Sequence, residues 1–305
     1  MTINGLSTLV NEASTWADAL GQQRAAYLGC GDSLAAARPG EALGHRVLSA
    51  GDVAWGEQPP RGVDLSIALS WSGRTGATIR AAEIVKASGQ PVWAITANPD
   101  SPLAQIADRH LHIPVAPREE EIPTWGFALH SIAILAALGI AADLPKVLAA
   151  AERLSSQLSA DLLPADAPHA ITVTTLPDSH ATGEFWSLKL IEATGVAVRL
   201  APLEEIGHVD YFVGPQPHLV LIPVVGIGRE RAARLGAALQ RNGNTVVSVD
   251  LAVTERDLSP QEFALALSIA GAALSHRAAE RWNRPPFRGG AVDMSAQHIQ
   301  VPSTN

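Results

Sequence analysis

The feature that most constrains this chain is a repeated alternation of short, largely apolar runs with helix-like segments. Three such runs, at 25–31, 63–70 and 91–97, each end in small or polar residues, and a helix-like pattern then begins. Strands that are apolar on both sides and are separated by helices are typical of parallel sheets covered on both faces. The sequence therefore predicts an α/β fold.

The alternation occurs in two rounds, separated by a Pro-, Ala- and Asp-rich stretch near residues 163–168. We expect one α/β domain over 1–150 and a second over 165–280, each a mainly parallel, doubly wound sheet flanked by helices. The tail, 281–305, has turn residues and little periodicity. At the other end, the pattern over 1–20 predicts one amphipathic helix.

Composition narrows the function classes. The chain has 305 residues and a net charge of -8, and its basic residues are scattered, which argues against a nucleic-acid or anionic-membrane partner. A single cysteine excludes intrachain disulfides and a Cys-rich zinc site, and the spacing of the histidines predicts no metal site. The sequence predicts neither a signal peptide nor a transmembrane helix, so a cytoplasmic location is expected.

The stretch "SWSGRT" places hydroxyl side chains between the expected strand 63–70 and the helix pattern of 78–89. Ligands of open parallel sheets bind at the carboxyl ends of strands, where helix N-termini present backbone N–H groups to oxyanions such as phosphate. Gly73 permits a tight loop close to such a ligand. The alternative is a Ser/Thr cluster that caps the helix without a ligand.

Four segments together resemble sugar isomerase (SIS) domains, which bind phosphosugars. "LSWSGRTGAT" resembles their S-x-S-G-x-T signature, and "LGCGDS" resembles the G-x-G-[TS]-S turn of the isomerase half of glucosamine-6-phosphate synthase. "SLKLIEATG" and "LEEIGHVDYF" resemble two later segments of that half, A-L-K-L-K-E-I-S and G-E-L-K-H-G-P. The resemblance covers nearly the whole chain and implies two tandem SIS domains.

The resemblance also implies a set of substrate-binding residues. Asp32 stands where the family usually has Thr, which leaves the identity of the substrate open. Thr124 precedes a helix at a place where the family has substrate-lining residues. The implied binding set is Cys30, Gly31, Asp32 and Ser33 beside the sugar, Ser70, Trp71 (through its backbone), Ser72, Gly73 and Thr75 at the phosphate, and Thr124.

Three catalytic residues are implied by the same resemblance. Glu192 matches a glutamate that moves a proton between C1 and C2, His208 matches a histidine implicated in opening the sugar ring, and Lys189 precedes Glu192 by one helical turn. The family often supplies this histidine from a neighbouring subunit, which implies a homodimer with shared active sites. A carboxylate and an imidazole suit this proton chemistry, and neither a metal nor a redox cofactor is required. A surface ion pair is the alternative interpretation of Lys189 and Glu192.

These residues predict an isomerase of a phosphorylated sugar or amino sugar, working through a cis-enediol or enediolamine, with or without release of an amine. A phosphosugar–amine deglycase and a catalytically silent phosphosugar sensor remain alternatives. The chain begins Met1-Thr2 without a nucleophilic cysteine, so glutamine-dependent amidotransfer is not expected. The tail has no lysine, unlike the synthases, and "TTLPDSHATGEF" lacks the Ser-rich signature, so we expect one phosphate site per chain.

Overall fold

The protein contains two compact units, each built on its own parallel sheet. The computed structural model describes residues 3–114, 122–212, 218–251 and 255–284. Unit 1 includes the described residues of 1–119 and 125–142, and unit 2 includes those of 120–124 and 143–292. The predicted α/β architecture, with parallel strands flanked by helices, is confirmed.

Unit 1 has a five-stranded sheet in the order β2-β1-β3-β4-β5, and every neighbouring pair is parallel. Its strands are β1 (Ala25–Gly29), β2 (Arg46–Ser49), β3 (Leu65–Leu69), β4 (Val92–Thr96) and β5 (Arg109–His112). Its helices are α1 (Ile3–Ser14), α2 (Ala17–Leu20), α3 (Asp32–Ala37), α4 (Ala50–Gly56), α5 (Gly76–Ala87), α6 (Pro102–Ile106) and α7 (Trp125–Ala137), with a 3₁₀ helix, η1, at Arg38–Leu43.

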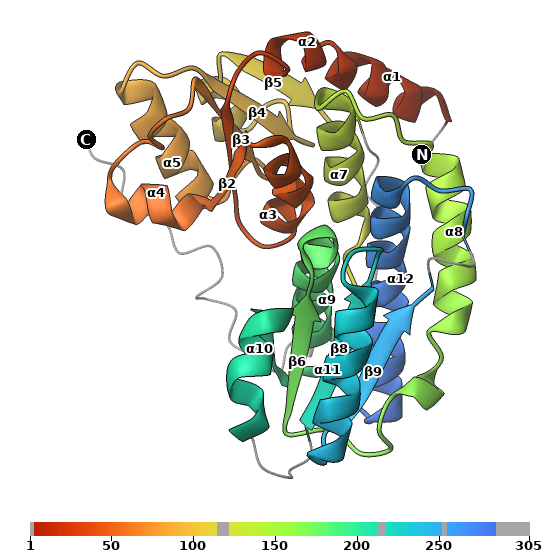
Figure 1. Ribbon diagram of the computed structural model, residues 1–305. Helices are drawn as coiled ribbons and strands as arrows, with labels where there is room; N and C mark the ends of the chain where they lie inside the picture. Colours follow the sequence, from red (N-terminus) through yellow and green to blue (C-terminus); the bar gives the residue numbers. More distant parts are fainter. Residues whose placement is uncertain (1–2, 115–121, 213–217, 252–254, 285–305) are drawn as a thin grey trace. The chain divides into compact units, whose positions relative to one another are not determined.

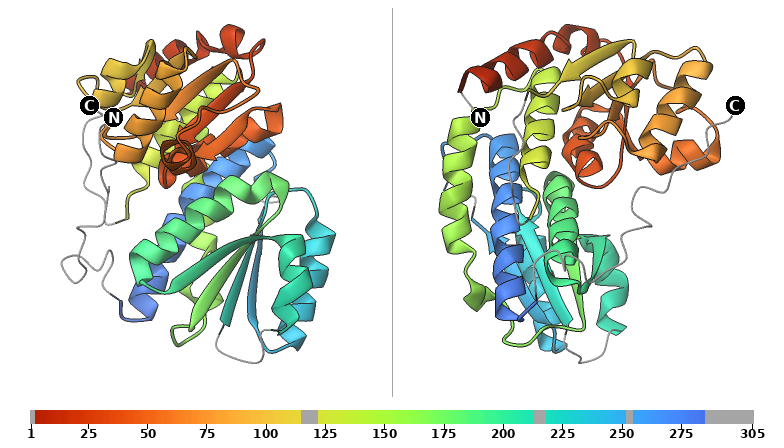
Figure 2. Two further views of the ribbon diagram at one scale, coloured as in Figure 1. Left: turned by 90° about the vertical axis from the view of Figure 1, so that its left-hand side faces the viewer. Right: turned by 180° about the vertical axis from the view of Figure 1, so that it is seen from behind.

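Helices cover both faces of this sheet, as the views in Figures 1 and 2 show. Every residue of β1, β3 and β4 is buried, because each strand side packs against a helix layer. Small side chains such as Ala26 and Ala68 pack with α4, α5 and α6 in one core cluster. On the other side of unit 1, α7 packs against α1 and α3.

Three details of unit 1 differ from the sequence prediction. No strand or helix was expected at β2 and α4, because β2 is short and begins with an exposed Arg46. The helix expected over 1–20 is two helices, since the chain turns between α1 and α2. Trp16 lies at this turn and is 3% exposed. Its ring makes a T-shaped, edge-to-face contact with the ring of Trp93, with a centroid distance of 4.7 Å. A tertiary aromatic contact therefore accompanies the break.

Unit 2 has a four-stranded sheet in the order β7-β6-β8-β9, again with parallel pairs. The strands are β6 (Ala170–Thr175), β7 (Ala197–Pro202), β8 (His218–Val224) and β9 (Thr245–Asp250). The helices are α8 (Leu144–Gln157), α9 (His180–Thr194), α10 (Leu203–Val209), α11 (Arg229–Arg241) and α12 (Pro260–Arg281), with 3₁₀ helices η2 (Ala160–Leu162), η3 (Pro177–Ser179) and η4 (Asp210–Phe212).

In unit 2, α12 lies beside α8 and α9 and packs against both (Figure 2). A core cluster joins α10 and α11 to strand β8. The contact of α12 with α9 is close at Gly271, where a Cβ atom would lie 1.8 Å from Nε1 of Trp186. That indole N–H donates to the carbonyl oxygen of Leu267 at 3.1 Å. A glycine is therefore required opposite the buried Trp186 ring.

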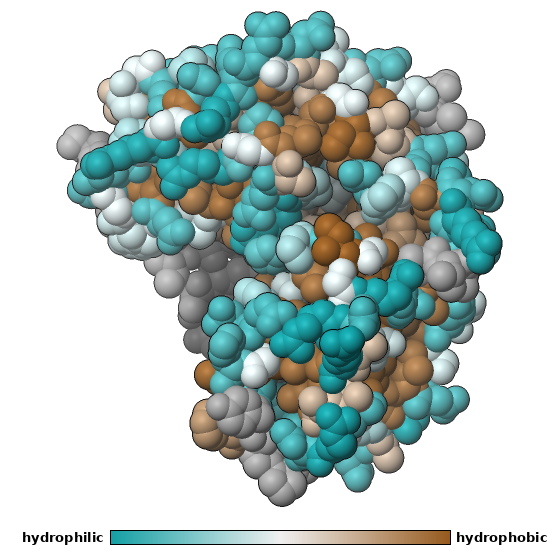
Figure 3. Space-filling view, viewed as in Figure 1, coloured by the Kyte–Doolittle hydropathy of each residue, from teal (hydrophilic) through white to brown (hydrophobic). Residues whose placement is uncertain are grey.

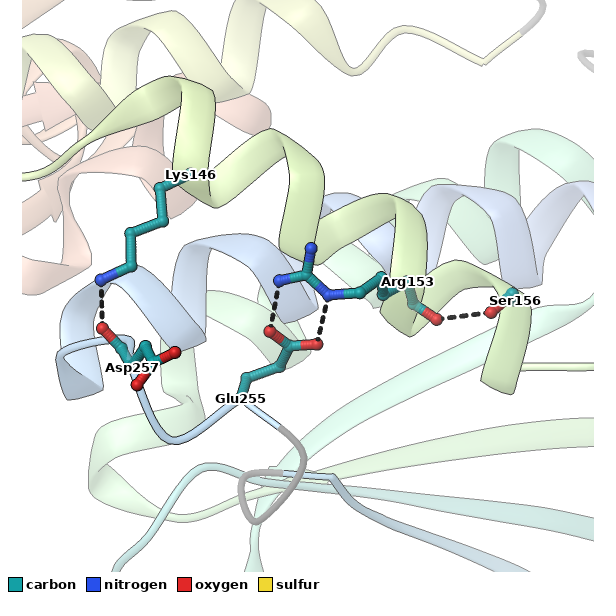
Figure 4. A network of polar contacts seen from close by, with 5 residues as sticks. All are labelled: Lys146, Arg153, Ser156, Glu255 and Asp257. Carbon is teal, nitrogen blue, oxygen red and sulfur yellow. Dashed lines mark hydrogen bonds and ion pairs between the residues drawn. The ribbon is translucent and has the colours of Figure 1, made fainter.

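Charged side chains attach α8 to the segment that leads into α12 (Figure 4). Arg153 donates to both carboxylate oxygens of Glu255, at 3.0 and 2.6 Å, and Lys146 donates to the carbonyl oxygen of Asp257. Glu255 is 8% exposed, so its charge is satisfied by the bidentate arginine contact rather than by bulk water. This network fixes the start of α12, where Ser259 and Glu262 form a capping box.

The outer face of α11 carries Arg, Glu and Gln side chains, and hydrophilic residues gather there in the space-filling view (Figure 3). Arg231 of α11 makes a bidentate contact with Glu204 of α10, at 2.8 and 2.9 Å. Throughout the described ranges, none of the helices has both the length and the apolar run that crossing a membrane would require.

Candidate functional site

The topology of unit 1 brings two of the predicted binding segments to one edge of its sheet. β1 pairs with β2 on one side and with β3 on the other, so the strand order reverses at β1 and β3. The segment 30–33 follows β1, and the loop Ser70–Thr75 follows β3. Both therefore lie at the carboxyl edge of the sheet, at the switch point where open α/β sheets bind ligands.

Two hydroxyl groups of the loop bond to each other. Ser70 is 3% exposed, and its Oγ lies 3.0 Å from Oγ1 of Thr75. Thr75 occupies the N-cap position of α5 but makes no side-chain capping bond, so helix capping does not account for its hydroxyl group. The N–H of Ile79 makes a bond within this helix start, to the carbonyl oxygen of Thr75 at 3.0 Å. The N–H groups of the first turn lack intrahelical partners and suit an anion.

Gly73 is required by a protein neighbour as well as by its backbone conformation. Its φ is +63°, and a Cβ atom would lie 2.1 Å from Oγ of the buried Ser101. The carbonyl oxygen of Gly73 accepts from the N–H of Leu103 at 3.3 Å. Ser72 lies at the outer side of the loop, where its Oγ accepts from the N–H of Arg74 at 3.2 Å. The sequence-based reason for Gly73, approach to a ligand, thus omitted its contact with Ser101.

Trp71 is anchored to the neighbouring strand end through its backbone. Its carbonyl oxygen accepts from the N–H of Ala97 at 3.0 Å and from Oγ1 of Thr96 at 3.1 Å. Its side chain is 36% exposed and makes an edge-to-face ring contact with His130. Because the carbonyl group is committed to this anchor, a ligand contact through the Trp71 backbone would use the N–H group.

Cys30 is the first of the four predicted residues that follow β1, and it is partly buried. Burial raises the pKa of its thiol, while the Thr78 hydroxyl and the N–H groups of Gly51 and Ala50 act in the opposite direction. A raised pKa keeps the thiol protonated at neutral pH, so Cys30 is suited to packing and weak hydrogen bonding rather than to nucleophilic attack.

The next three residues form the turn into α3. Gly31 has a φ of +54° at the N-cap position, and Asp32 and Ser33 open the helix. Asp32 lies in the first turn, where a carboxylate is stabilised by the helix dipole. Ser33 is 8% exposed. The position where the family usually has Thr therefore holds a residue that also suits the start of a helix.

In unit 2, Lys189 and Glu192 form a close ion pair on α9. Nζ of Lys189 donates to Oε2 of Glu192 at 2.6 Å and lies 5.2 Å from the centre of the Phe185 ring. The Lys189 side chain has no exposed surface, whereas that of Glu192 is 32% exposed. A buried ammonium group needs such a partner, because its desolvation is otherwise very costly. The alternative of a surface ion pair is therefore wrong for Lys189.

The two remaining predicted residues lie elsewhere. His208 is exposed in the last turn of α10, a different helix from the one that carries Glu192. Thr124 belongs to unit 2 and precedes α7; its Oγ1 donates to the carbonyl oxygen of Ile122 at 3.0 Å. Within the described part of the chain, no group of three or more His, Cys, Asp or Glu side chains is placed to hold a metal ion.

A cavity of about 670 Å³ lies at the opposite, amino-terminal edge of the unit 1 sheet. Its lining includes Arg24, His45 and Asp64, which directly precede β1, β2 and β3. Nδ1 of His45 accepts from the N–H of Ala25 at 3.1 Å, and burial lowers the pKa of this imidazole. None of the predicted site residues lines this cavity.

The sequence analysis missed residues that support the loop from behind. Thr96 and Ser101 are fully buried beside Trp71 and Gly73 of the loop, and His130 contacts Trp71 from α7. Thr78 is fully buried in α5, the helix that follows the loop. Of these residues, Thr78 was the easiest to recognise from the sequence, because it follows the Ser70–Thr75 loop by three positions. The spacing of Gly126 and His130, one helical turn apart, acquires meaning only once α7 is placed behind Trp71.

Comparison with known proteins gives a family for part of the chain. Residues 61–140, which include the Ser70–Thr75 loop, match the SIS domain family. A 3-hexulose-6-phosphate isomerase from Mycobacterium gastri is 42% identical over 57 residues, which are 19% of this chain and 29% of that protein. The chain thus aligns with less than a third of this curated relative.

Solved structures extend the similarity to the whole fold. Tagatose-6-phosphate ketose/aldose isomerase from Escherichia coli superposes with a TM-score of 0.76 at 16% identity, over 97% of this chain and 92% of that one. Glucosamine-6-phosphate deaminase from Thermotoga maritima gives 0.68 at 19% identity, over 94% and 96%. The chain therefore has the fold of these sugar-phosphate enzymes, and its residues 61–140 carry a SIS domain sequence.

Proposed function

We propose that the protein is an isomerase of a phosphorylated sugar or amino sugar, with the phosphate bound at the Ser70–Thr75 loop. The observation that carries this proposal is the loop itself. It lies at a sheet switch point, pairs the hydroxyl groups of Ser70 and Thr75 at 3.0 Å, and opens α5 without a side-chain cap. Hydroxyl groups and unpaired N–H groups at a helix N-terminus are the donors that a phosphate requires. The SIS match over 61–140 supports the same assignment.

The segment 30–33 would contact the sugar, because it occupies the other side of the same switch point. Gly31 leaves open space where a Cβ would otherwise stand. Asp32 would select substrates that present hydroxyl or amino hydrogens at this place, since a carboxylate accepts hydrogen bonds. Thr124 stays a binding candidate of the same proposal.

Glu192 is the proposed base. In the open-chain aldose its carboxylate removes the C2 proton, which yields a cis-enediolate with its charge on O1. The O2 hydrogen then passes to O1, and Glu192 returns the proton to C1, which gives the ketose. Lys189 holds the carboxylate in place through the 2.6 Å ion pair, and the partial exposure of Glu192 leaves it accessible to a substrate. A positioned general base typically contributes about 100-fold or more to the rate.

His208 would open the sugar ring in the active site of a second copy of the chain. Its exposure on α10 fits a residue that acts outside its own subunit. The proposal therefore includes a homodimer with shared active sites. Sedimentation at micromolar concentration should show a dimer, and a fully active monomer would contradict this part of the proposal.

The decisive experiment is a panel of phosphosugars and amino-sugar phosphates, followed by ketose formation, ammonia release and hydrogen exchange in deuterated water. An isomerase forms ketose and exchanges the C2 hydrogen. A deaminase or a deglycase also releases an amine, so ammonia or free amine separates these two classes from a simple isomerase. Binding without any exchange would replace the proposal with a phosphosugar sensor.

A further inference from the structure

His130 is a buried titratable group in unit 1 that the proposed mechanism does not use. It lies on α7, is 1% exposed, and its Nε2 has no hydrogen-bond partner among the described residues. An unpaired buried polar atom costs free energy and calls for an explanation. A leucine would fill the same space without that cost, so the position of the imidazole relative to the loop is informative.

The His130 ring touches the phosphate loop at its Trp71 side. The two ring centroids lie 5.9 Å apart with an interplanar angle of 79°, an edge-to-face contact. One helical turn earlier on α7, a Cβ atom on Gly126 would lie 3.3 Å from Cε3 of Trp71. Gly126 and His130 thus form one platform on which the Trp71 indole rests.

A second contact connects His130 to the strand end under the loop. The backbone groups of Ile95 and Gly126 favour the protonated form of its ring, although neither makes a hydrogen bond to Nε2. The Ile95 carbonyl oxygen also accepts from the N–H of Ser70 at 3.2 Å. His130 is therefore connected to the first two residues of the loop. It contacts Trp71 through its ring, and it lies next to the Ile95 backbone, whose carbonyl oxygen accepts from the N–H of Ser70.

We propose that His130 is a positioning residue of the Ser70–Thr75 loop, which holds Trp71 and the Ile95 carbonyl so that the loop is preformed for a phosphate. The proposal rests on the phosphate-binding function proposed above. Burial lowers the pKa of His130 to about 4, so the imidazole is neutral at physiological pH and adds no charge behind the loop. Its contribution is geometric, and it acts through Trp71 and Ser70 rather than on the ligand.

Two backbone amides report the loop without any ligand. The Ser70 N–H bonds to Ile95, and the Ala97 N–H bonds to the Trp71 carbonyl oxygen at 3.0 Å. A matched control is the Asp64 N–H, which bonds to the Arg24 carbonyl oxygen at 2.7 Å at the amino edge of the same sheet. Hydrogen exchange at these three amides separates a local effect on the loop from a general loss of stability.

In His130→Leu, exchange of the Ser70 and Ala97 amides should accelerate by about tenfold relative to the Asp64 amide, because the ring contact and the carbonyl contact are both removed. His130→Phe keeps an aromatic edge against Trp71 and should restore most of the protection at Ala97. The proposal is overturned if His130→Leu keeps wild-type exchange, if Asp64 accelerates as much as the loop amides, or if phenylalanine restores nothing.

Gly126→Ala repeats the test with a substitution that favours the helix and will fold. The added methyl group crowds the Trp71 ring, so the Ala97 amide should exchange faster, and unchanged exchange would count against the proposal. In a binding assay, His130→Leu and Gly126→Ala should weaken the binding of fructose 6-phosphate and leave the binding of fructose unchanged. In an activity assay, the two variants should raise KM more than they lower kcat. If the wild-type protein binds no phosphosugar, the proposed function fails, while the exchange experiment still decides the role of His130.

Discussion

The two sheets of the protein have the same kind of switch point, but different groups occupy it. In unit 1, the loop after β3 presents the hydroxyl groups of Ser70 and Thr75. In unit 2, the corresponding strands are β6 and β8, and the segment after β6 carries Asp178. Oδ2 of Asp178 accepts from the N–H of Ile227, which follows β8, at 2.7 Å.

The carboxylate of Asp178 therefore lies at the sheet position of unit 2 that corresponds to the proposed anion site of unit 1. It crosses from one loop to the other and uses a backbone N–H that an external phosphate would need. Its negative charge would also repel such a ligand. The same topology thus places the proposed anion site in one unit and an internal carboxylate–amide contact in the other, which is consistent with the expectation of one phosphate site per chain.

The two units also treat a buried histidine differently. In unit 2, His218 is 8% exposed and both of its ring nitrogens have partners, Oγ1 of Thr172 at 2.8 Å and Oδ1 of Asn244 at 3.0 Å. In unit 1, Nε2 of His130 has no partner within the described residues. Unit 2 uses its histidine to join two strands to the end of α11, whereas unit 1 places its histidine behind the candidate site.

The largest effect is expected from unit 2, where the proposed base resides. Glu192→Gln keeps the shape of the side chain and removes its basicity, so turnover should fall by about 100-fold or more while phosphosugar affinity changes little. Turnover and exchange of the C2 hydrogen with deuterated water are the measurements. Glu230→Gln, at an exposed ion pair on α11, is the matched control. Undiminished exchange in Glu192→Gln would place the base elsewhere, with Glu184 or Glu205 as the next candidates.

Acid should destabilise unit 1 through His130. The folded pKa is about 4 and the ordinary value is 6.5, so between these values the unfolded chain binds a proton that the folded unit excludes. The free energy of unfolding should therefore fall as pH is lowered from 6.5 to 4, by about 3 kcal/mol from this group. Denaturant unfolding of wild type and His130→Phe measures it as a difference in pH dependence. Identical pH dependence in the two proteins would contradict the assignment.

Loss of the loop hydroxyls should reduce the free energy of phosphosugar binding by an amount no larger than the change in unfolding free energy expected from His130. Ser72→Ala combined with Thr75→Ala removes two donors, which should cost about 1–3 kcal/mol of phosphosugar binding and spare unphosphorylated analogues. Calorimetric titration with both ligand types is the measurement. Ser14→Ala with Thr15→Ala removes two exposed hydroxyls near the end of α1 and should change neither. Equal losses for both ligand types would reject the loop as the phosphate site.

The smallest effect is expected at the carboxylate–amide contact of unit 2. This test uses the protein that lacks the Ser72 and Thr75 hydroxyls. In it, Asp178→Ser should strengthen the binding of inorganic phosphate at the Ile227 N–H by about 1 kcal/mol or less. The shift of the Ile227 amide resonance during a phosphate titration is the measurement. Glu230→Ser removes the same charge nearby on α11 and should not produce this shift. If both variants give the same shift, the effect of Asp178 would come from its negative charge alone and not from its contact with the Ile227 N–H.

Much of the fold could be predicted because it depends on local patterns. Buried strands such as β3 and β4 are continuous apolar runs, and Gly195 ends α9 with a φ of +65°, as a C-terminal glycine does. The pairing of Lys189 with Glu192 followed from helical spacing alone. β2 and α4 could not be predicted, because a short edge strand with one buried residue has no periodicity to detect.

The sequence by itself determined the alternation of strands and helices, the loop after β3, and the side chains that could bind or catalyse. Only the tertiary structure decided that Lys189 is buried, that Gly73 meets Ser101, and that Asp178 reaches Ile227. The reason is physical. Periodicity and turn chemistry act between residues a few positions apart, whereas these contacts join residues that only the packing of strands and helices brings within hydrogen-bonding or van der Waals distance.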